Sequence, residues 1–396
     1  MEYSDRQIIN FSNADRTARG RVDSPFTILT LLLLLIGVMM VLSASFARAY
    51  YDPDKEATYY FIRQSFFALS GCAIMYIVSR IPLDLYKRYS MPVFALSLLL
   101  LVLVLVAGTA ANGAKRWFSI GGITFQPSEI AKIAVIIFEA RIICAYKGKM
   151  HSFRYGVIPF VLVAVSVVGL LVLEPHLSAS IIILGVTAAM MYMGGTSMKW
   201  FLILGAAAAL ALGLMAFGMD YSSDRISAWM DPFADSSDTG YQIVQSLYSI
   251  GSGGLSGLGL GQSRQKNLYL PEEHNDFIFA VVCEELGFIG AAAILCLFAM
   301  LIIRGFWLAL HCKDRYHCLV CGGISSLLAF QVILNVAVVT NLIPCTGISL
   351  PFFSYGGTAL WLQLGEMGII LSASRTIPEK VVRYRNTNSN FQYVRE

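Results

Sequence analysis

The stretch from Ser24 to Ala47, SPFTILTLLLLLIGVMMVLSASFA, is an apolar run of the length that a helix needs to cross a bilayer. Its apolar part is too long for a cleaved signal peptide, whose core spans roughly 7–15 residues. Similar blocks recur along the chain between short charged stretches. Ten are expected, at 24–47, 61–79, 91–109, 127–146, 155–173, 177–197, 200–219, 276–303, 317–341 and 354–374. The sequence therefore predicts an all-α polytopic membrane protein with ten transmembrane helices.

The overall composition agrees with a membrane protein. Of 396 residues, 57% are hydrophobic and 14% are charged, and the mean hydropathy is +0.65. Soluble domains carry about 25% charged residues, so an ordinary globular enzyme and a disordered chain are both excluded. Nearly all of the eight cysteines lie within or beside apolar blocks, which favours small core residues over a disulfide framework. The net charge of +4 gives no indication of nucleic-acid binding.

Lysine and arginine are distributed unevenly between the two sets of loops. With the N-terminus in the cytoplasm, the inner segments carry 19 of these residues and the outer segments carry 7. Because cytoplasmic loops are enriched in Lys and Arg, both termini are predicted to be cytoplasmic. The expected organisation is a cytoplasmic tail at 1–23, a transmembrane domain at 24–375 and a second cytoplasmic tail at 376–396.

The connection between the seventh and eighth blocks, residues 220–275, is a long outer loop. Loops beyond about 12–15 residues in a compact protein are usually functional or disordered, and this one carries aromatic residues and many acids. Trp229 and Phe233 can anchor it in the membrane interface, which would hold Asp235 near the membrane surface. A carboxylate there can act as a general base. The alternative is an acidic, solvated turn.

A second polar stretch runs from Asn112 to Lys132. Pro127 and Ser128 resemble a helix start, which places Glu129 and Lys132 on one face, one turn inside the membrane. Ionisable groups at that depth face a protein interior or a watery cavity and need a partner. Two interpretations remain open: an internal ion pair that fixes helix packing, or an outward polar cavity with Lys115 and Arg116 at its rim.

Two further outer segments are rich in small residues. Residues 251–263 hold many glycines but lack both the phosphate-loop ending and the Rossmann spacing. They allow close backbone approach to an anion; the alternative is a tight re-entrant turn, and the two are not exclusive. Residues 344–358 carry no charge, and their small residues beside Pro351 suggest a broken or re-entrant helix that lines a cavity.

Together, these motifs resemble the SEDS family (shape, elongation, division and sporulation), which includes RodA, FtsW and SpoVE. The resemblance covers residues 24–375. It rests on KRW at 115–117, QPSE at 126–129, GYQ at 240–242, GLGQSRQK at 259–266, YLPE at 269–272, DFIF at 276–279 and PFFSYGG at 351–357. The Gln265–Lys266 form of the loop is closer to the division and sporulation branches than to RodA.

The resemblance implies a peptidoglycan glycosyltransferase that polymerises lipid II on the outer face of the bacterial cytoplasmic membrane. The family's proposed catalytic aspartate lies five residues before the glycine of GYQ, which is Asp235 here. It would deprotonate the acceptor hydroxyl. The substrate-binding residues expected from the motifs are Lys115, Arg116, Glu129, Lys132, Gln262, Ser263, Gln265, Lys266, Glu272, His274, Asp276 and Ser354.

The resemblance also implies partners and alternatives. No tightly bound cofactor is expected, although Mg²⁺ or Mn²⁺ can accompany the substrate pyrophosphate. The expected partners are lipid II, the nascent glycan chain, a class B penicillin-binding protein and other division or elongation proteins. The alternatives are a lipid II flippase or other lipid-linked oligosaccharide transporter, and a scaffold for the penicillin-binding protein. A transporter would place its essential charges near the bilayer midplane, whereas the polar stretches here are on the outer side.

Two positions depart from the family pattern. Before the sixth block, Glu174-Pro175-His176-Leu177-Ser178-Ala179 stands where the family usually has Gln-Pro-Asp-Leu-Gly-Thr. An acid is thereby replaced by a titratable imidazole. Asn275 stands where the family commonly has threonine. These differences affect the charge of the expected cavity rather than the fold.

Overall fold

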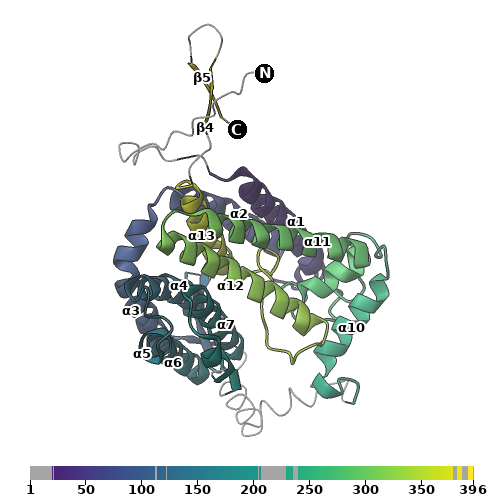
Figure 1. The fold of residues 1–396 in the computed structure, drawn as a ribbon. Coiled ribbons are helices and arrows are strands. Elements are labelled where there is room, and N and C mark those ends of the chain that lie inside the picture. Colours follow the sequence, from purple (N-terminus) through teal and green to yellow (C-terminus); the bar gives the residue numbers. More distant parts are fainter. Residues whose placement is uncertain are drawn as a thin grey trace.

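The computed structural model describes residues 20, 22–111, 114–121, 123–203, 205–206, 229–234, 240–377, 381–385 and 391–395. In these ranges the chain is mainly helical (Figure 1). The helices are α1 (Ser24–Tyr50), α2 (Tyr59–Val78), α3 (Leu83–Ala107), α4 (Pro127–Ala145), α5 (Phe153–Gly156), α6 (Ile158–Leu173), α7 (Leu177–Gly194), α10 (Tyr241–Gly253), α11 (Ile278–His311), α12 (Arg315–Val339) and α13 (Gly357–Ser374). The strands are β1 (Thr109–Ala111), β2 (Ala114–Ile120), β3 (Ile123–Phe125), β4 (Val381–Arg385) and β5 (Phe391–Arg395), which pair as two antiparallel sheets, β1-β2-β3 and β4-β5.

Two of the long helices begin at an aspartate that satisfies a free backbone donor. The carboxylate of Asp23 accepts a hydrogen bond from the Phe26 amide at 2.9 Å, directly before the apolar run of α1. Asp314 does the same for the Tyr316 amide at 2.7 Å, before α12. Because the first amides of a helix have no partner within the helix, such caps determine where it begins.

The prediction of a multi-pass membrane protein is confirmed. Seven helical segments in the described ranges are long and apolar enough to cross a membrane: α1, α2, α3, α5 with α6, α7, α11 and α12. Helices α4 and α13 coincide with two more predicted blocks. Most of the block at 200–219 and part of the loop at 220–275 lie outside the described residues. The count of ten helices and the extent of that loop therefore stay predictions.

The start of the third helix differs from the prediction. Helix α3 begins at Leu83, whereas the apolar block began at residue 91. Its first two turns contain Lys87 and Arg88, which interrupt the apolar run but have good helix propensity. Their long side chains can keep the charge in the interface while the stems cover apolar surface.

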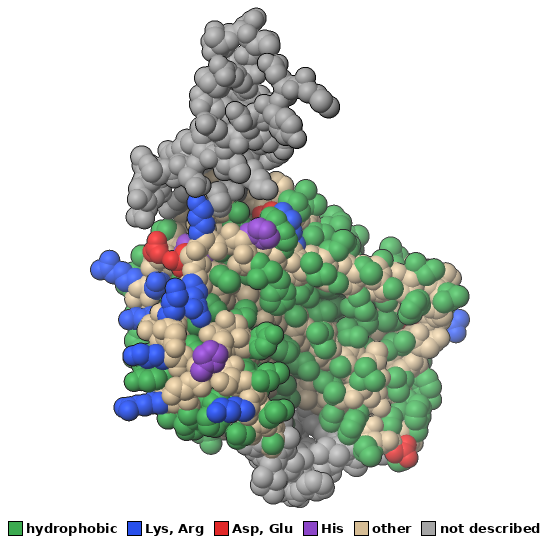
Figure 2. Space-filling view, viewed as in Figure 1, with side chains coloured by type: hydrophobic (Ala, Val, Ile, Leu, Met, Phe, Trp, Pro, Cys, Tyr) green, Lys and Arg blue, Asp and Glu red, His purple; other side chains and the backbone are tan. Residues whose placement is uncertain are grey.

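Helix α12 forms the centre of the bundle, where it packs against α4, α7, α11 and α13 (Figure 1). In its most apolar 18-residue window 72% of residues are buried, compared with 28% in α2 and α3. Hydrophobic side chains cover much of the visible surface, and Lys and Arg gather toward one side of it (Figure 2). The bundle therefore presents apolar side chains outward as well as inward, as expected for a protein surrounded by lipid.

The β1-β2-β3 sheet and the connections that precede α7, α11 and α13 meet at one end of the bundle, which we call the cavity end. Helix α1 packs closely on the last of these connections. A Cβ atom on Gly37 would lie 2.4 Å from the carbonyl oxygen of Phe352. Only glycine allows this approach, so α1 fixes the position of the segment that leads into α13.

Candidate functional site

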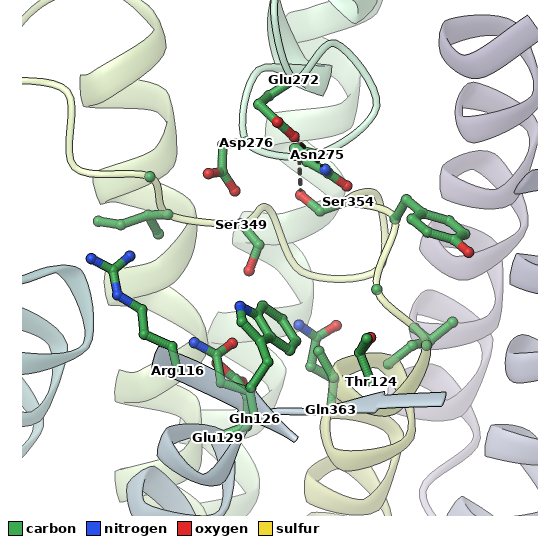
Figure 3. Close-up of a pocket in the computed structure, with 18 of the residues that line it drawn as sticks. Arg116, Thr124, Gln126, Glu129, Glu272, Asn275, Asp276, Ser349, Ser354 and Gln363 are labelled. Atoms are coloured by element: carbon green, nitrogen blue, oxygen red, sulfur yellow. Dashed lines mark hydrogen bonds between the residues drawn. The ribbon is translucent and has the colours of Figure 1, made fainter. Parts of the chain in front are cut away.

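The cavity end contains a polar cavity of about 640 Å³ (Figure 3). Its walls come from α2, the β1-β2-β3 sheet, α4, α7, α12 and α13, and from the connections before α11 and α13. The side chains at its centre are Arg116, Thr124, Gln126, Glu129, Glu272, Asn275, Asp276, Ser349, Ser354 and Gln363. They come from segments that are more than 200 residues apart in the chain, so only the tertiary structure brings them together.

The first wall combines β2 with the start of α4. Helix α4 begins at Pro127, as the sequence predicted, and its Glu129 and Lys132 form an ion pair of 2.7 Å. The Lys132 side chain is 3% exposed and lines the cavity, with its charge matched by Glu129. Arg116 on β2 donates hydrogen bonds to the carbonyl oxygens of Glu174, at 3.0 Å, and Pro175. The predicted polar cavity and the predicted ion pair are thus both present.

The connection between α6 and α7 carries the residues that depart from the family pattern. His176 is buried, with Nε2 3.5 Å from Nε2 of Gln126 and Nδ1 without a described partner. Burial lowers the pKa of His176 to about 3, and the charges of Arg116 and Lys132 act in the same direction. Burial also raises the pKa of Glu174 to about 8. The imidazole is therefore neutral at physiological pH.

The connection into α11 supplies two carboxylates. Asn275 donates to the Glu272 carboxylate at 2.5 Å, and the Asn335 side chain on α12 holds the carbonyl oxygen of Asp276 at 2.9 Å. Burial raises the pKa of Asp276 to about 6, and the charge of Glu272 raises it further, although part of the Asp276 surface remains open to the cavity. Figure 3 shows Glu272, Asn275 and Asp276 on one side of the cavity, facing the sheet.

The connection into α13 closes the cavity. The Ser354 hydroxyl donates to the carbonyl of Asn275 at 2.8 Å and accepts from the Leu350 amide at 2.7 Å. Phe352 adopts a left-handed backbone conformation, φ 65°, and its amide donates to the Gln363 side chain at 3.0 Å. Strained residues of this kind cost about 1–3 kcal/mol and gather at functional sites. The predicted cavity-lining role of this uncharged segment is confirmed.

A second buried polar region lies outside the cavity. We call it the α11 network; its members are Ser43, Ser249, Ser263, Lys266, Glu284 and Glu285. Lys266 forms an ion pair of 2.9 Å with Glu285, and the Ser43 hydroxyl bonds to the same carboxylate at 2.6 Å. The Ser263 hydroxyl bonds to Glu284 at 2.5 Å. Predicted site residues Ser263 and Lys266 thus bind protein groups rather than line the cavity.

The glycine-rich run explains how this network forms. Helix α11 departs from helical geometry at Gly287, with φ 66° and ψ −171°. There the glycine-rich segment inserts: the Leu258 amide donates to the Glu284 carbonyl at 2.9 Å, and the Phe288 amide donates to the Gly254 carbonyl at 2.9 Å. A Cβ atom on Gly257 would lie 2.2 Å from the Glu285 carbonyl oxygen. The structure shows the tight turn, packed against a broken helix, while the approach of its amides to an anion stays a prediction.

The structure divides the predicted site residues into groups. Six of them line the cavity: Arg116, Glu129, Lys132, Glu272, Asp276 and Ser354. Lys115 is exposed beside it, and His274 is buried behind the rings of Tyr60 and Tyr355. Gln262 and Gln265 do not line the cavity among the described residues. Asp235 lies outside the described residues.

The segments on either side of Asp235 are described, and both are held at the cavity end. The Trp229 indole donates to the Asn341 carbonyl at 3.1 Å, and the Asn341 side chain returns a bond to the Trp229 carbonyl at 3.3 Å. On the other side, Gln242 of the GYQ motif lines a smaller cavity of about 180 Å³. Arg116 and Asp276 line this smaller cavity as well as the larger one.

Sequence reasoning missed several cavity residues. Gln331 on α12 and Gln363 on α13 line the cavity and are isolated amides within apolar blocks. That isolation is a usable signal, because unpaired polar groups in a membrane are costly. Lys55, in the loop before α2, and Arg63, in its first turns, also line the cavity. Nothing in their local sequence sets them apart from ordinary residues at a helix end.

Several buried polar atoms at the cavity have no described partner. They are Nδ1 of His176, Oδ1 of Asn275 and Oε1 of Gln331. Such atoms are rare in folded proteins because each costs about 1–3 kcal/mol when it lacks a hydrogen bond. All three belong to side chains that line the cavity. Their arrangement suits a ligand with many hydroxyl and amide groups.

Comparison with known proteins agrees with this arrangement. Residues 24–378 match the FtsW/RodA/SpoVE family, described as "Cell cycle protein". The chain is 39% identical to stage V sporulation protein E of Bacillus subtilis (strain 168), over 91% of this chain and 98% of that protein. It is 38% identical to a probable peptidoglycan glycosyltransferase FtsW of Geobacter sulfurreducens, over 89% of this chain and 95% of that protein.

Solved structures show the same fold. One is a chain from a study of the structural coordination of polymerization and crosslinking by a peptidoglycan synthase complex; it has a TM-score of 0.75 and 29% identity over 89% of this chain and 98% of that chain. The rod shape determining protein RodA of Thermus thermophilus has a TM-score of 0.66 and 29% identity over 90% of this chain and 97% of its own. The resemblance inferred from the motifs is confirmed: this chain belongs to the FtsW/RodA/SpoVE family, whose helical membrane fold builds the cavity described above.

Proposed function

We propose that this protein is a peptidoglycan glycosyltransferase that polymerises lipid II into glycan strands. One observation carries the proposal beyond family membership: the cavity combines a buried lysine, further cations, carboxylates and polar atoms without a described partner at one end of a membrane bundle. Lipid II joins an apolar polyprenyl chain, a pyrophosphate and a sugar. A polar cavity beside lipid suits both ends of such a molecule.

In the proposed reaction Asp235 acts as the general base. It takes the proton from the acceptor sugar hydroxyl, whose oxygen then attacks the anomeric carbon of the donor. The bond from that carbon to the pyrophosphate oxygen breaks, and the leaving pyrophosphate carries away the electron pair. The position of Gln242 supports this role for Asp235, because Gln242 lines the smaller cavity. Asp235 is five positions before Gly240 in the same segment, at most about 18 Å of extended chain.

The cations of the first wall would stabilise the leaving group. Arg116 and Lys132 line the cavity, and charge that develops on a pyrophosphate is stabilised most by cations already held in place. Lys115, exposed at the rim, would attract the anion before it enters. Five other predicted site residues would act indirectly, by fixing the chain on either side of Glu272: Gln262, Ser263, Gln265, Lys266 and His274.

A divalent cation would fit beside the carboxylates of the same cavity. The carboxylates of Glu272 and Asp276 both line the cavity, and Mg²⁺ and Mn²⁺ prefer oxygen ligands. No group of three His, Cys, Asp or Glu side chains in the described ranges forms a metal site on its own. Pyrophosphate oxygens would therefore complete the coordination. Such an ion would add positive charge beside the leaving group.

Orientation and partners follow from the same proposal. The cavity end would face the outside of a bacterial cytoplasmic membrane, with both termini in the cytoplasm, as the distribution of Lys and Arg indicates. A class B penicillin-binding protein would crosslink the strands made here. The similarity to a chain from a peptidoglycan synthase complex supports this partner.

The decisive experiment measures glycan polymerisation from purified lipid II. Wild type is compared with Asp235→Asn, with and without a cognate transpeptidase blocked by a β-lactam, after both proteins are shown to be folded by thermal unfolding. Polymer from wild type and at least about a hundredfold less from the variant supports general-base catalysis. Equal polymer from both removes Asp235 from the mechanism. No polymer from either, with the partner present, favours lipid transport or a scaffold role.

A further inference from the structure

The cavity has a second wall, built from other elements than the wall that carries Arg116, that the proposed mechanism does not use. It is formed by Lys55, Tyr59, Tyr60 and Arg63, at and just before the start of α2, together with Tyr355 in the connection into α13. We call the rings of Tyr59, Tyr60 and Tyr355 the tyrosine wall. Figure 3 shows Ser354, the neighbour of Tyr355, on the other side of the cavity from Arg116.

The tyrosine wall is a continuous aromatic surface. The ring centroids of Tyr59 and Tyr60 are 5.3 Å apart and those of Tyr60 and Tyr355 are 5.0 Å apart, both pairs edge to face. The His274 ring packs behind them, 4.8 Å from Tyr60. Edge-to-face contacts at these distances are favourable, so the wall is preorganised. All three tyrosines are half-buried, which leaves part of each ring open to the cavity.

Two cations lie against the same rings. The Lys55 ammonium is 5.2 Å from the Tyr60 centroid and 3.1 Å from its hydroxyl oxygen. The Arg63 guanidinium is 5.4 Å from the Tyr59 centroid and donates to its hydroxyl at 2.5 Å. Lys55 also pairs with Asp52 at 2.7 Å, and this hydrogen bond raises the pKa of Lys55 well above its usual value. Both groups are therefore charged at any physiological pH.

The charges of the cavity are thus divided between two sides. Arg116 and Lys132 belong to the first wall, whereas Lys55 and Arg63 belong to the second. The carboxylates that line the cavity, Glu129, Glu272 and Asp276, come from α4 and the connection into α11. On the second wall, Lys55 pairs with the carboxylate of Asp52.

The proposed reaction requires two anions at once. Each glycan that takes part, the donor and the acceptor, carries its own polyprenyl pyrophosphate. Two pyrophosphates in one low-dielectric cavity repel each other strongly, so each needs separate cations. Open aromatic rings beside cations suit a sugar joined to a phosphate, because the rings offer an apolar face and the cations bind the oxygens.

We propose that Lys55, Arg63 and the tyrosine wall form a second substrate subsite, which binds the pyrophosphate and first sugar of one of two polyprenyl-linked glycans while Arg116 and Lys132 bind the other. This inference rests on the proposed glycosyltransferase function. It adds which residues of the cavity bind the second of the two lipid-linked pyrophosphates.

The direct test counts bound lipids without any turnover. The full chain is titrated with undecaprenyl pyrophosphate in detergent containing phosphatidylglycerol, and the complexes are counted by native mass spectrometry. Wild type is expected to bind two molecules at saturation. Lys55→Gln with Arg63→Gln is expected to bind one, and so is Arg116→Gln. A single molecule on wild type overturns the proposal, and so does an unchanged count of two on the Lys55 and Arg63 variant.

Kinetics with lipid II give a second test that does not depend on the double variant folding. Lys55 lies in the loop before α2, so Lys55→Gln leaves the helix intact. The lipid II concentration for half-maximal rate is expected to rise about tenfold, because a charge-assisted hydrogen bond is lost, and the maximal rate should fall less. Lys55→Arg should restore the wild-type value. Glu56→Gln, an exposed neighbour, is the matched control and should change nothing.

The two proposals can fail separately. If the protein binds two lipids but makes no polymer in the presence of its cognate transpeptidase, the glycosyltransferase function is contradicted and the second subsite is retained. Polymer from a protein that binds only one lipid would support the glycosyltransferase function but contradict the second subsite. An unchanged half-maximal concentration in folded Lys55→Gln would also overturn the subsite.

Discussion

The cavity and the α11 network are both buried polar regions of this membrane bundle, yet they differ in whether their polar atoms are satisfied. In the network, each carboxylate oxygen of Glu284 and Glu285 has a partner, and Lys266 donates to both Glu285 and Ser43. In the cavity, polar atoms of His176 and Asn275 have no described partner. A satisfied network stabilises a fold, whereas unsatisfied groups are tolerated where a ligand binds.

Residues that lie close together in the sequence are divided between these two regions. The segment from Gly259 to Glu272 contains Ser263 and Lys266, which belong to the network, and ends at Glu272, which lines the cavity. The first part of the segment fixes the chain and the last part presents a carboxylate. Variants in the network should therefore change stability, and variants in the cavity should change substrate use.

The largest effect is expected for Lys266→Met. It leaves the Glu285 carboxylate buried without its cation, which typically costs about 3–5 kcal/mol of folding free energy. Thermal unfolding in detergent measures the loss. Arg264→Met is the matched control, because the Arg264 side chain is exposed and only its backbone amide bonds to Glu284. A stable Lys266→Met protein with a raised half-maximal lipid II concentration would instead place Lys266 in substrate binding.

Gly287→Ala is expected to lower the free energy of unfolding by about 3 kcal/mol. The causes are backbone strain at φ 66° and a clash with the Gly257 amide nitrogen, 2.2 Å from the new Cβ. The turn that carries the network would have to shift. Gly251→Ala in α10, where a Cβ meets open space, should gain roughly 0.5–1 kcal/mol. Equal unfolding temperatures for the two variants would show that the break in α11 does not depend on glycine.

Asp276→Asn should act in the opposite direction on stability. Because burial raises the pKa of Asp276 to about 6, the ionised form destabilises the folded state above that pH. The variant should gain about 1–2 kcal/mol at pH 7.5, allowing for screening by water in the cavity. The stability difference between variant and wild type should disappear as the pH falls from about 6 towards 4, because Asp276 of the folded wild type becomes protonated over this range. Polymerisation should decrease at pH 7.5, and a variant that is neither more stable nor less active would contradict the cavity role.

The smallest effect is expected for His176→Asn. Burial lowers the pKa of His176 to about 3, so the imidazole does not titrate in the working range. Stability at pH 7 should fall by about 0.5–1 kcal/mol, because the shorter side chain leaves part of a buried site unfilled. The curves of rate against pH for the variant and wild type should superimpose between pH 6 and 8. An inflection near 6.5 that the variant loses would show that His176 is charged during turnover.

Much of the fold could be predicted because its signals are local. The apolar blocks, the caps at Asp23 and Asp314 and the pairing of Glu129 with Lys132 all depend on residues a few positions apart. The start of α3 was predicted wrongly, because a helix can continue through charged residues that end an apolar run. The candidate site was only partly predictable, since motifs identified its residues without showing which of them meet.

The sequence by itself determined that this chain crosses the membrane repeatedly, that it belongs to its family, and that polar residues gather in a few segments between the apolar blocks. Only the tertiary structure decided that Lys266 pairs with Glu285 while Glu272 lines the cavity, and that Lys55 and Arg116 line the same cavity. The physical reason is that hydropathy and helix periodicity are properties of neighbouring residues. Which buried charges meet depends on the packing of helices far apart in the chain, down to contacts as close as Gly37 against Phe352.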